Sequence, residues 1–162
     1  MLGSMADLQP ADACVDDAGR VPLPRLLAQA EAAFAADFDR RLRTSDFPTL
    51  SLAHSRNVLR HLADGPRRAS AIAVECGVSK QALSQQIAHL EHNGLVATEP
   101  DPHDARARLV TLTASGVRAQ QLVRRLFVDI EAEWAGEFGD DDLAALRRVL
   151  QAVLNRGRVR PC

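Results

Sequence analysis

The sequence predicts a mainly α-helical fold of the α+β class, in which a winged helix-turn-helix is flanked by long helices on both sides. Residues 69–95 contain two short amphipathic segments that meet at Gly77, the arrangement of a helix-turn-helix. Two short β-type segments, Val96–Glu99 and Arg108–Leu112, follow directly and indicate a β-hairpin. A helix-turn-helix followed by a hairpin is the element order of a winged helix.

Two helices are predicted before this unit. Leu23–Leu42 has a wide apolar face of the kind that packs on more than one partner. Pro48–Ala63 has leucines on one side and ends at Asp64-Gly65-Pro66, a strong stop signal. Residues 1–20 show no hydrophobic periodicity, and we predict that they form a disordered tail.

The helix-turn-helix is indicated by its turn residue and by helical spacing on either side. Gly77 can enter the left-handed conformation of a tight turn without the steric penalty of a Cβ atom. Ser79 is a candidate N-cap of the second helix, because its hydroxyl can accept an otherwise unpaired backbone N–H. The residues expected in the apolar interface are Ile72, Ala73, Cys76, Leu83, Ile87 and Leu90.

The opposite face of the second helix is nearly uncharged and rich in amide and hydroxyl groups. Such groups can pair with base edges in a DNA major groove, whereas a merely solvated face usually carries more Glu and Lys. We predict that Gln81, Ser84, Gln85 and His89 read bases. Phosphate and wing contacts complete the predicted DNA-binding set: Arg67, Arg68, Ser79, Lys80, Arg106 and Arg108.

The segment Pro100–Ala107 is predicted to be the loop between the two strands, which is the wing. A loop that carries arginines beside the reading helix can follow a phosphate backbone or enter the minor groove, where Arg is electrostatically favoured. An ordinary polar hairpin with its charges in water is the simpler alternative.

Two more helices are predicted after the hairpin, over Thr113–Glu137 and Asp142–Asn155. Together with the first helix they carry more apolar surface than one small winged helix needs, and a twofold mate would bury it. A symmetric dimer would also place two reading helices about 34 Å apart, one turn of DNA. We therefore predict one domain over residues 21–157, with the winged helix-turn-helix at 49–112 and dimerisation helices at 21–46 and 113–157.

Composition limits the class of protein. The chain has 162 residues, of which 46% are hydrophobic, enough for a core. Its net charge of −1 does not by itself indicate nucleic-acid binding, although residues 47–118 have a net excess of bases and contain all 5 histidines. We find no apolar run near ~18 residues and no signal-peptide pattern, so we expect a cytoplasmic protein that does not enter a membrane.

Neither a metal site nor a catalytic site is predicted. Cys14, Cys76 and Cys162 are odd in number and far apart, which gives no disulfide or zinc framework, and Cys76 is expected in the core. His89 and His92 are spaced to share a metal, but no further ligands complete a tetrahedral set. Phosphate loops, nucleophile elbows and zinc-protease motifs are absent, so we expect no cofactor and no enzymatic activity.

In these features the chain resembles the MarR family of winged-helix regulators over about Leu23–Leu154. The most specific match is an acidic wing with an arginine, followed by a strand and then by Leu-Thr-x-x-Gly at the start of a helix. The matching segments are Ala73…Gly77-Val78-Ser79, Leu83-Ser84, Leu90-Glu91…Asn93-Gly94-Leu95-Val96, Asp101-Pro102-His103-Asp104-Ala105-Arg106 and Val110-Thr111-Leu112-Thr113…Gly116.

The resemblance implies a homodimer that binds a pseudo-palindromic operator in double-stranded DNA, usually as a repressor, and that is released by a small ligand or an oxidant. It implies that Asp104 holds Arg106 in place. The chain departs from the family at His103 and Ala105, where members often carry Arg, and it lacks the usual acid before Ala73. By analogy of fold, a small aromatic or lipophilic effector would bind near Phe34, Phe38, Phe47 and His54.

Other functions are compatible with the same residues. One is a winged helix that contacts only proteins. Another is a redox- or metal-sensing member of the same family. Peroxide-sensing members use a cysteine in the first helix with Tyr support, whereas this chain has no Tyr and Cys14 precedes the first helix. The function that we predict is that of a DNA-binding transcriptional regulator.

Overall fold

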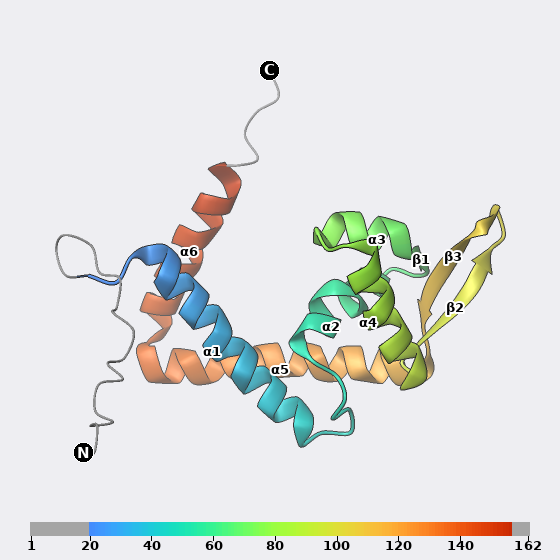
Figure 1. The fold of residues 1–162 in the computed structure, drawn as a ribbon. Helices are drawn as coiled ribbons and strands as arrows, with labels where there is room; N and C mark the ends of the chain where they lie inside the picture. Colours follow the sequence, from blue (N-terminus) through green and yellow to red (C-terminus); the bar gives the residue numbers. More distant parts are fainter. Residues whose placement is uncertain (1–19, 157–162) are drawn as a thin grey trace, which may run out of the picture. The chain divides into compact units, whose positions relative to one another are not determined.

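The structure is a computed structural model that describes residues 20–156, except for the side chains of residues 105 and 106. The predicted tail, apart from Arg20, and both Cys14 and Cys162 therefore lie outside the described residues. The elements are α1 (Leu23–Arg43), α2 (Leu52–Asn57), a 3-10 helix η1 (Leu59–Leu62), β1 (Arg67–Arg68), α3 (Ala69–Cys76), α4 (Lys80–His92), β2 (Val96–Asp101), β3 (Asp104–Leu112), α5 (Ala114–Phe138) and α6 (Asp140–Arg156) (Figure 1).

The predicted fold class is confirmed: helices predominate, and one small antiparallel sheet accompanies the helix-turn-helix. By internal packing the chain divides into two units, one that ends at Asp37 and one that begins at Phe38. The described part of the first unit consists mainly of the N-terminal turns of α1. The second unit contains the end of α1 and every later element.

The core of the second unit joins residues from helices and strands. Phe38 is fully buried at the end of α1, and its ring centroid lies 4.9 Å from that of Phe127 on α5. The other large side chains with essentially no exposure are Leu42, Val58, Leu59, Ile72, Leu83, Leu90, Val96, Val110 and Ile130. The apolar stripe predicted for the reading helix is therefore confirmed as buried.

The prediction of one continuous helix over Pro48–Ala63 is wrong. Helix α2 starts only at Leu52, because the Ser51 side chain accepts the His54 N–H and caps it. It ends at Asn57, because Val58 has φ −124° and ψ −65°, outside the helical region. The side chain of Val58 is fully buried, and the 3-10 helix η1 continues the chain after it.

The predicted helix-turn-helix is confirmed in its local geometry. Gly77 has φ 66° and ψ 25°, the left-handed conformation, and its N–H donates to carbonyls of α3. The N–H of Val78 donates to Ala73 O at 3.2 Å, which completes the C-cap of α3. Ser79 caps α4 by accepting the Ala82 N–H at 3.1 Å. Helix α4 thus begins where its sequence signals predict.

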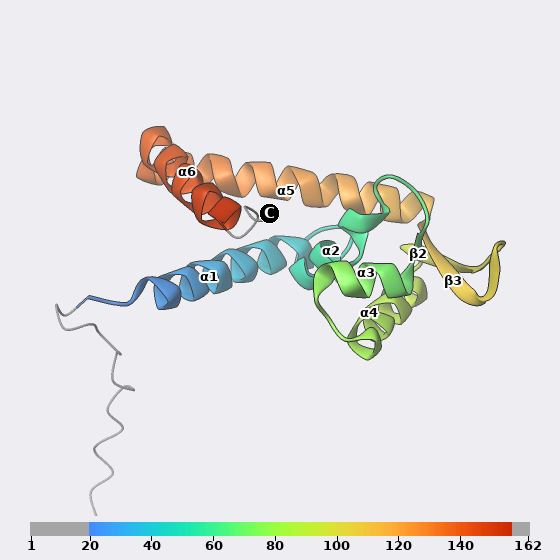
Figure 2. The same ribbon diagram turned by 90° about the horizontal axis from the view of Figure 1, so that it is seen from above.

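The hairpin is longer than expected. Strands β2 and β3 pair from Val96 with Leu112 to Asp101 with Asp104, so most of the predicted loop Pro100–Ala107 is strand. Only residues 102–103 lie between the strands. The short strand β1, which was not predicted, pairs with β3 and gives the sheet order β1-β3-β2. The hairpin extends to the side of α4 in both views (Figure 2).

Helix α5 begins in tight contact with the end of the helix-turn-helix. Thr113 caps α5 by accepting the Gly116 N–H at 3.0 Å, and its hydroxyl donates to Gly94 O at 2.6 Å. A Cβ atom built on Gly116 would lie 1.9 Å from the backbone oxygen of Leu95. This close approach explains the glycine in the Leu-Thr-x-x-Gly segment.

Within residues 20–156, none of the helices combines the length and the low polarity that crossing a bilayer requires. The same residues contain no group of three or more His, Cys, Asp or Glu side chains placed to hold a metal ion.

We expect Gly116→Ala to destabilise the protein, because the new methyl group would collide with a backbone atom that cannot rotate away. Overpacking of this kind costs about 1–3 kcal/mol, which should lower the melting temperature by several degrees in a thermal melt. The matched control is Gly136→Ala in the same helix, where nothing lies within 4 Å of the new Cβ. The control should stabilise by roughly 0.5–1 kcal/mol. Equal melting temperatures for the two variants would contradict the close approach at Gly116.

Candidate nucleic-acid interface

The predicted reading residues of α4 are on its accessible side. Lys80, Gln81, Ser84 and Gln85 are exposed, whereas Leu83, Ile87 and Leu90 on the opposite side are buried. Ser79, directly before this helix, is also exposed and uses its side chain as the N-cap. The exposed residues between Gln81 and Gln85 offer amide and hydroxyl groups, which suit hydrogen bonding to base edges.

His89 lies at the edge of this face and is held by α2 and the segment before it. Its Nε2–H donates to Thr49 O at 2.9 Å, and its ring stacks on His54 with centroids 4.6 Å apart and planes 10° from parallel. His54 in turn lies 3.0 Å from the Ser51 hydroxyl through Nδ1. The two rings therefore join the reading helix to α2, and base reading by His89 stays a prediction.

Burial lowers the pKa of His54, and the nearby His89 lowers it further, while Asp39 acts in the opposite direction. The cause is physical: a charged imidazolium loses hydration when it is half buried, and a second charged ring beside it would repel it. The folded protein therefore favours neutral His54. Sequence spacing could not reveal this pair, because its members lie on different helices.

Arg68 on β1 and Asp101 at the tip of the hairpin form an ion pair that connects β1 to the wing. The Arg68 Nε–H donates to Asp101 Oδ2 at 2.6 Å, and the Asp101 side chain is only 4% exposed. Asp101 Oδ1 accepts the His103 N–H at 2.8 Å, so the same carboxylate also closes the turn of the hairpin. The His103 N–H is the main reason that the pKa of Asp101 is lowered, with Arg68 adding to it and burial opposing it.

This arrangement gives Arg68 a structural partner besides its predicted role at phosphate. Asp104, the predicted wing support, lies 4.0 Å from Arg68 Nη1. Arg106 belongs to β3, but its side chain is outside the described part, so the predicted pairing of Asp104 with Arg106 stays a prediction. Asp101 was not among the predicted site residues, although an Asp at the start of a Pro-containing turn is a known turn signal.

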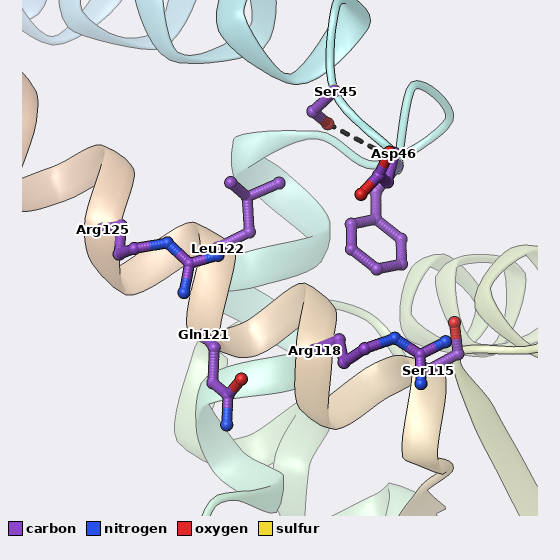
Figure 3. Close-up of a pocket in the computed structure, with 8 residues that line it drawn as sticks. Ser45, Asp46, Ser115, Arg118, Gln121, Leu122 and Arg125 are labelled. Atoms are coloured by element: carbon purple, nitrogen blue, oxygen red, sulfur yellow. Dashed lines mark hydrogen bonds between the residues drawn. The ribbon is translucent and has the colours of Figure 1, made fainter.

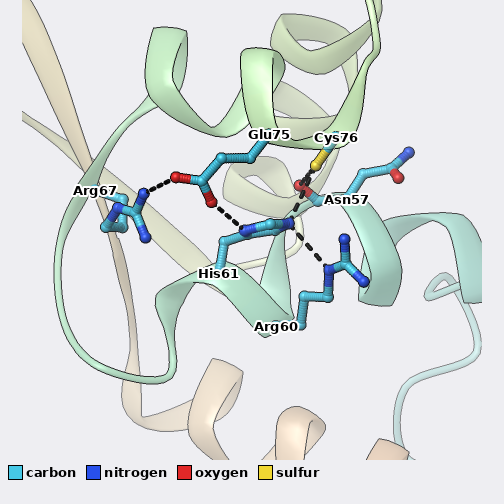
Figure 4. A network of polar contacts seen from close by, with 6 residues as sticks. All are labelled: Asn57, Arg60, His61, Arg67, Glu75 and Cys76. Carbon is cyan, nitrogen blue, oxygen red and sulfur yellow. Dashed lines mark hydrogen bonds and ion pairs between the residues drawn. The ribbon is translucent and has the colours of Figure 1, made fainter. Parts of the chain in front are cut away.

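Arg67 joins a polar network behind the helix-turn-helix (Figure 4). Arg67 pairs with Glu75 and is the main cause of that carboxylate's lowered pKa. The other Glu75 oxygen lies 3.0 Å from His61 Nδ1, and His61 Nε2 accepts the Arg60 Nε–H at 3.0 Å. Because Nε2 accepts, the hydrogen of the neutral ring is assigned to Nδ1, where it can be donated to Glu75.

Cys76 belongs to the same network, and its expected place in the apolar core is wrong. Its side chain is only half buried, with Sγ 3.2 Å from Asn57 O and 3.1 Å from His61 Nε2. The helical spacing of Cys76 put it on the correct side of α3, but the last turn of this helix faces polar groups at the end of α2.

A cavity of about 540 Å³ lies between the segment after α1 and the first half of α5 (Figure 3). It is lined by Ser45, Asp46, Phe47, Ser115, Arg118, Gln121, Leu122 and Arg125. Two guanidinium groups beside apolar surface suit an anionic ligand with an apolar part.

The predicted effector residues are not together at this cavity. Phe47 lines it, but Phe38 is fully buried against Phe127, and His54 stacks on His89. Phe34 belongs to the first unit. The arginines of α5 were not predicted as effector residues, because helical spacing alone does not show which exposed residues border a cavity.

Comparisons with known proteins agree with this geometry. The model of a family described as the MarR family matches residues 50–107. The transcriptional regulator HosA of Escherichia coli O111:H- is 29% identical over 99 residues, which span 60% of this chain and 73% of HosA. The transcriptional activatory protein BadR of Rhodopseudomonas palustris is 35% identical over 83 residues, 48% of this chain and 45% of BadR.

A solved structure shows the same fold. The transcriptional repressor CouR, bound to a 23-mer DNA duplex, aligns with a TM-score of 0.71 over 82% of this chain and 92% of CouR. The sequence identity is 24%. Likeness at this level shows that the fold is shared.

The lowered pKa of His54 predicts a pH-dependent stability. Above the unfolded pKa of about 6.5 the ring is neutral in both states, whereas below it the unfolded chain binds the proton more readily. Stability should therefore fall as the pH drops below this value towards the lower folded pKa. Denaturant unfolding between about pH 7.5 and about pH 5 should show a smaller decline for His54→Asn than for the parent chain. The control is His92→Asn, an exposed histidine on α4; a similar change of slope in that variant would rule out this role for His54.

Proposed function

Because the chain belongs to the MarR family of winged helix-turn-helix transcriptional regulators, we propose that it is a DNA-binding repressor that acts as a homodimer on a pseudo-palindromic operator. We propose further that a small ligand releases it. The observation that carries the proposal is the exposed, amide- and hydroxyl-rich side of α4 beside a projecting hairpin. Such a helix can enter a major groove while the wing contacts the adjoining backbone.

The DNA contact that we propose for each residue follows from the chemistry of its side chain. Gln81, Ser84 and Gln85 offer hydrogen-bond donors and acceptors, which can distinguish bases. Lys80 at the start of α4 carries charge, which attracts phosphate regardless of sequence. Arg106 and Arg108 on β3 extend these contacts along the wing. His89 contributes at the edge of the reading face.

The homodimer is supported by the apolar surface of α6. None of the residues of this helix is buried, yet it presents an apolar stripe at helical spacing. Leu146, Val149, Val153 and Leu154 are between 47% and 70% exposed. An exposed apolar stripe of this size is typical of a protein interface, and a second copy of the chain would cover it by twofold symmetry.

The effector would bind in the cavity beside α5. Arg118 and Arg125 can neutralise a carboxylate or phosphate, and Phe47 with Leu122 can cover an aromatic or lipophilic part. A ligand changes DNA affinity only if it binds one spacing of the two reading helices better than the other.

We propose that the protein represses transcription. Among its relatives, CouR is a repressor by its name and BadR an activator. We expect the protein to work in the cytoplasm, without a cofactor and without enzymatic activity.

The contacts of α4 and of the wing should differ in sequence dependence. Gln85→Ala should weaken binding to the cognate site by about 1–3 kcal/mol and relax one base position, because a base-edge contact is lost. Arg106→Ala should weaken binding to all sequences about equally and reduce the dependence on salt. Gel-shift titrations against the operator and a shuffled duplex would measure both. If both variants bound DNA as the parent chain does, the assignment of these contacts would be refuted. If the parent chain shifted no duplex at low salt, the alternative of a protein-interaction module would be favoured.

Dimerisation should depend on the apolar stripe of α6. Val153→Asp should convert the dimer into a monomer in sedimentation velocity, because an uncompensated charge would be buried in the interface. The control, Gln151→Glu, adds the same charge on the polar side of α6 and should leave the dimer intact. A parent chain that sediments as a stable monomer would contradict the homodimer.

Effector binding should require the arginines of the cavity. A panel of aromatic carboxylates can first be screened for a ligand that releases the parent chain from DNA. Arg118→Gln should then raise the ligand concentration needed for release about tenfold, since a charge-assisted contact is worth roughly 1.5–3 kcal/mol. DNA affinity without ligand should stay as in the parent chain. If every ligand released this variant from DNA at the same concentration as the parent chain, the effector would bind at another site.

A further inference from the structure

Glu91 connects the reading helix to the wing. Its Oε1 accepts two hydrogen bonds from Thr98 on β2, one from the backbone N–H at 3.1 Å and one from the hydroxyl at 2.7 Å. Strand β2 is at the edge of the sheet, whose order is β1-β3-β2. A side chain of α4 therefore takes up a backbone donor of an edge strand, the kind of group that otherwise stays unpaired.

Arg108 extends this contact to the second strand of the wing. Its Nη2 donates to Thr98 O at 3.0 Å and to Thr98 Oγ1 at 3.1 Å. Because the single hydroxyl hydrogen of Thr98 goes to Glu91, the hydroxyl oxygen remains to accept from Arg108. The three side chains form a directed chain of hydrogen bonds from β3 through β2 to α4. We call Glu91, Thr98 and Arg108 the wing clamp.

The wing clamp borders a small hollow between α4 and the hairpin. This hollow has a volume of about 240 Å³, and its lining includes Ser84 and Ala88 from the reading helix beside all three clamp residues. The clamp thus lies between the reading helix and the wing.

Glu91 is negatively charged, although it lies on the helix that we propose to bind DNA. A carboxylate at the side of a DNA-reading helix repels phosphate and should lower affinity if it does nothing else. We propose that Glu91 is a positioning residue, whose carboxylate fixes the wing relative to α4 so that both can engage one duplex together. This inference rests on the proposed function, because it assigns a role within DNA binding.

The first test separates the hydrogen bonds of Glu91 from its charge. Glu91→Gln keeps an oxygen acceptor and removes the charge, so it should bind the operator at least as tightly as the parent chain. Glu91→Ala removes both and should bind about tenfold more weakly, as expected for the loss of charge-assisted hydrogen bonds. If Glu91 acts only by repulsion, both variants should bind more tightly, and that result would overturn the proposal.

A second pair of variants leaves the charge of the protein unchanged. Thr98→Val keeps the side-chain shape and removes the hydroxyl at the centre of the clamp, so it should weaken operator binding severalfold. Thr98→Ser restores the hydroxyl and should restore binding. Equal affinities for these two variants would speak against the clamp. Thermal melts show whether each variant is folded at the temperature of the titration.

A double-mutant cycle tests whether Glu91 acts through the wing. In an Arg106→Ala background the wing has lost a predicted DNA contact, so Glu91→Ala should cost much less than in the parent chain. Full additivity of the two losses would show that Glu91 acts elsewhere.

Amide exchange of the free protein separates failure of this inference from failure of the proposed function. The Thr98 amide should exchange faster in Glu91→Ala than in Glu91→Gln, because only the first variant lacks its acceptor. A parent chain that ignores duplex DNA at low salt would refute both proposals. A parent chain that binds DNA, with Glu91→Ala and Thr98→Val binding equally well, would refute the positioning role alone.

Discussion

The left-handed turn at Gly77 is the constraint on which the rest of the second unit depends. It lets α3 end and α4 begin within three residues, so that Ile72 and Leu83 can be buried together. Burial of one side of α4 leaves its amide and hydroxyl groups on the other side, because a helix turns 100° per residue. The exposure of these amide and hydroxyl groups is therefore a direct consequence of the packing of the apolar stripe of α4.

The wing depends on polar contacts rather than on a core of its own. Arg68 holds Asp101 at the tip of β2, and Glu91 and Arg108 meet at Thr98 nearer its start. A two-stranded hairpin is at most marginally stable alone, so its direction has to be fixed from outside. Several basic residues that look available for DNA in the sequence thus also have partners within the protein. The hairpin itself is not basic, because it carries the acids Glu99, Asp101 and Asp104 beside only two arginines, Arg106 and Arg108.

The fold could be predicted where the signals are local. The stripe at Leu83, Ile87 and Leu90 and the turn at Gly77 depend on neighbours within a few residues, and both were correct. The break at Val58 depends on burial, and helical spacing alone could not show it. The pairing of Arg68 with Asp101 joins residues 33 positions apart, as the stack of His54 on His89 also joins distant segments. Such contacts follow from how the elements pack, which a single sequence does not reveal.

A nearly neutral DNA-binding protein must obtain its affinity differently from a basic one. Weak attraction to phosphate leaves more of the selectivity to base-edge contacts, and joining two reading helices makes the second contact intramolecular. The spacing of the two copies then becomes the quantity that a ligand has to change. Helix α5 carries Arg118 and Arg125 at the cavity, and its other end leads through Gly139 into α6 with its exposed apolar stripe. One continuous helix therefore joins the proposed effector site to the proposed dimer surface. A change in the tilt of that helix would alter the spacing without any intermediate element.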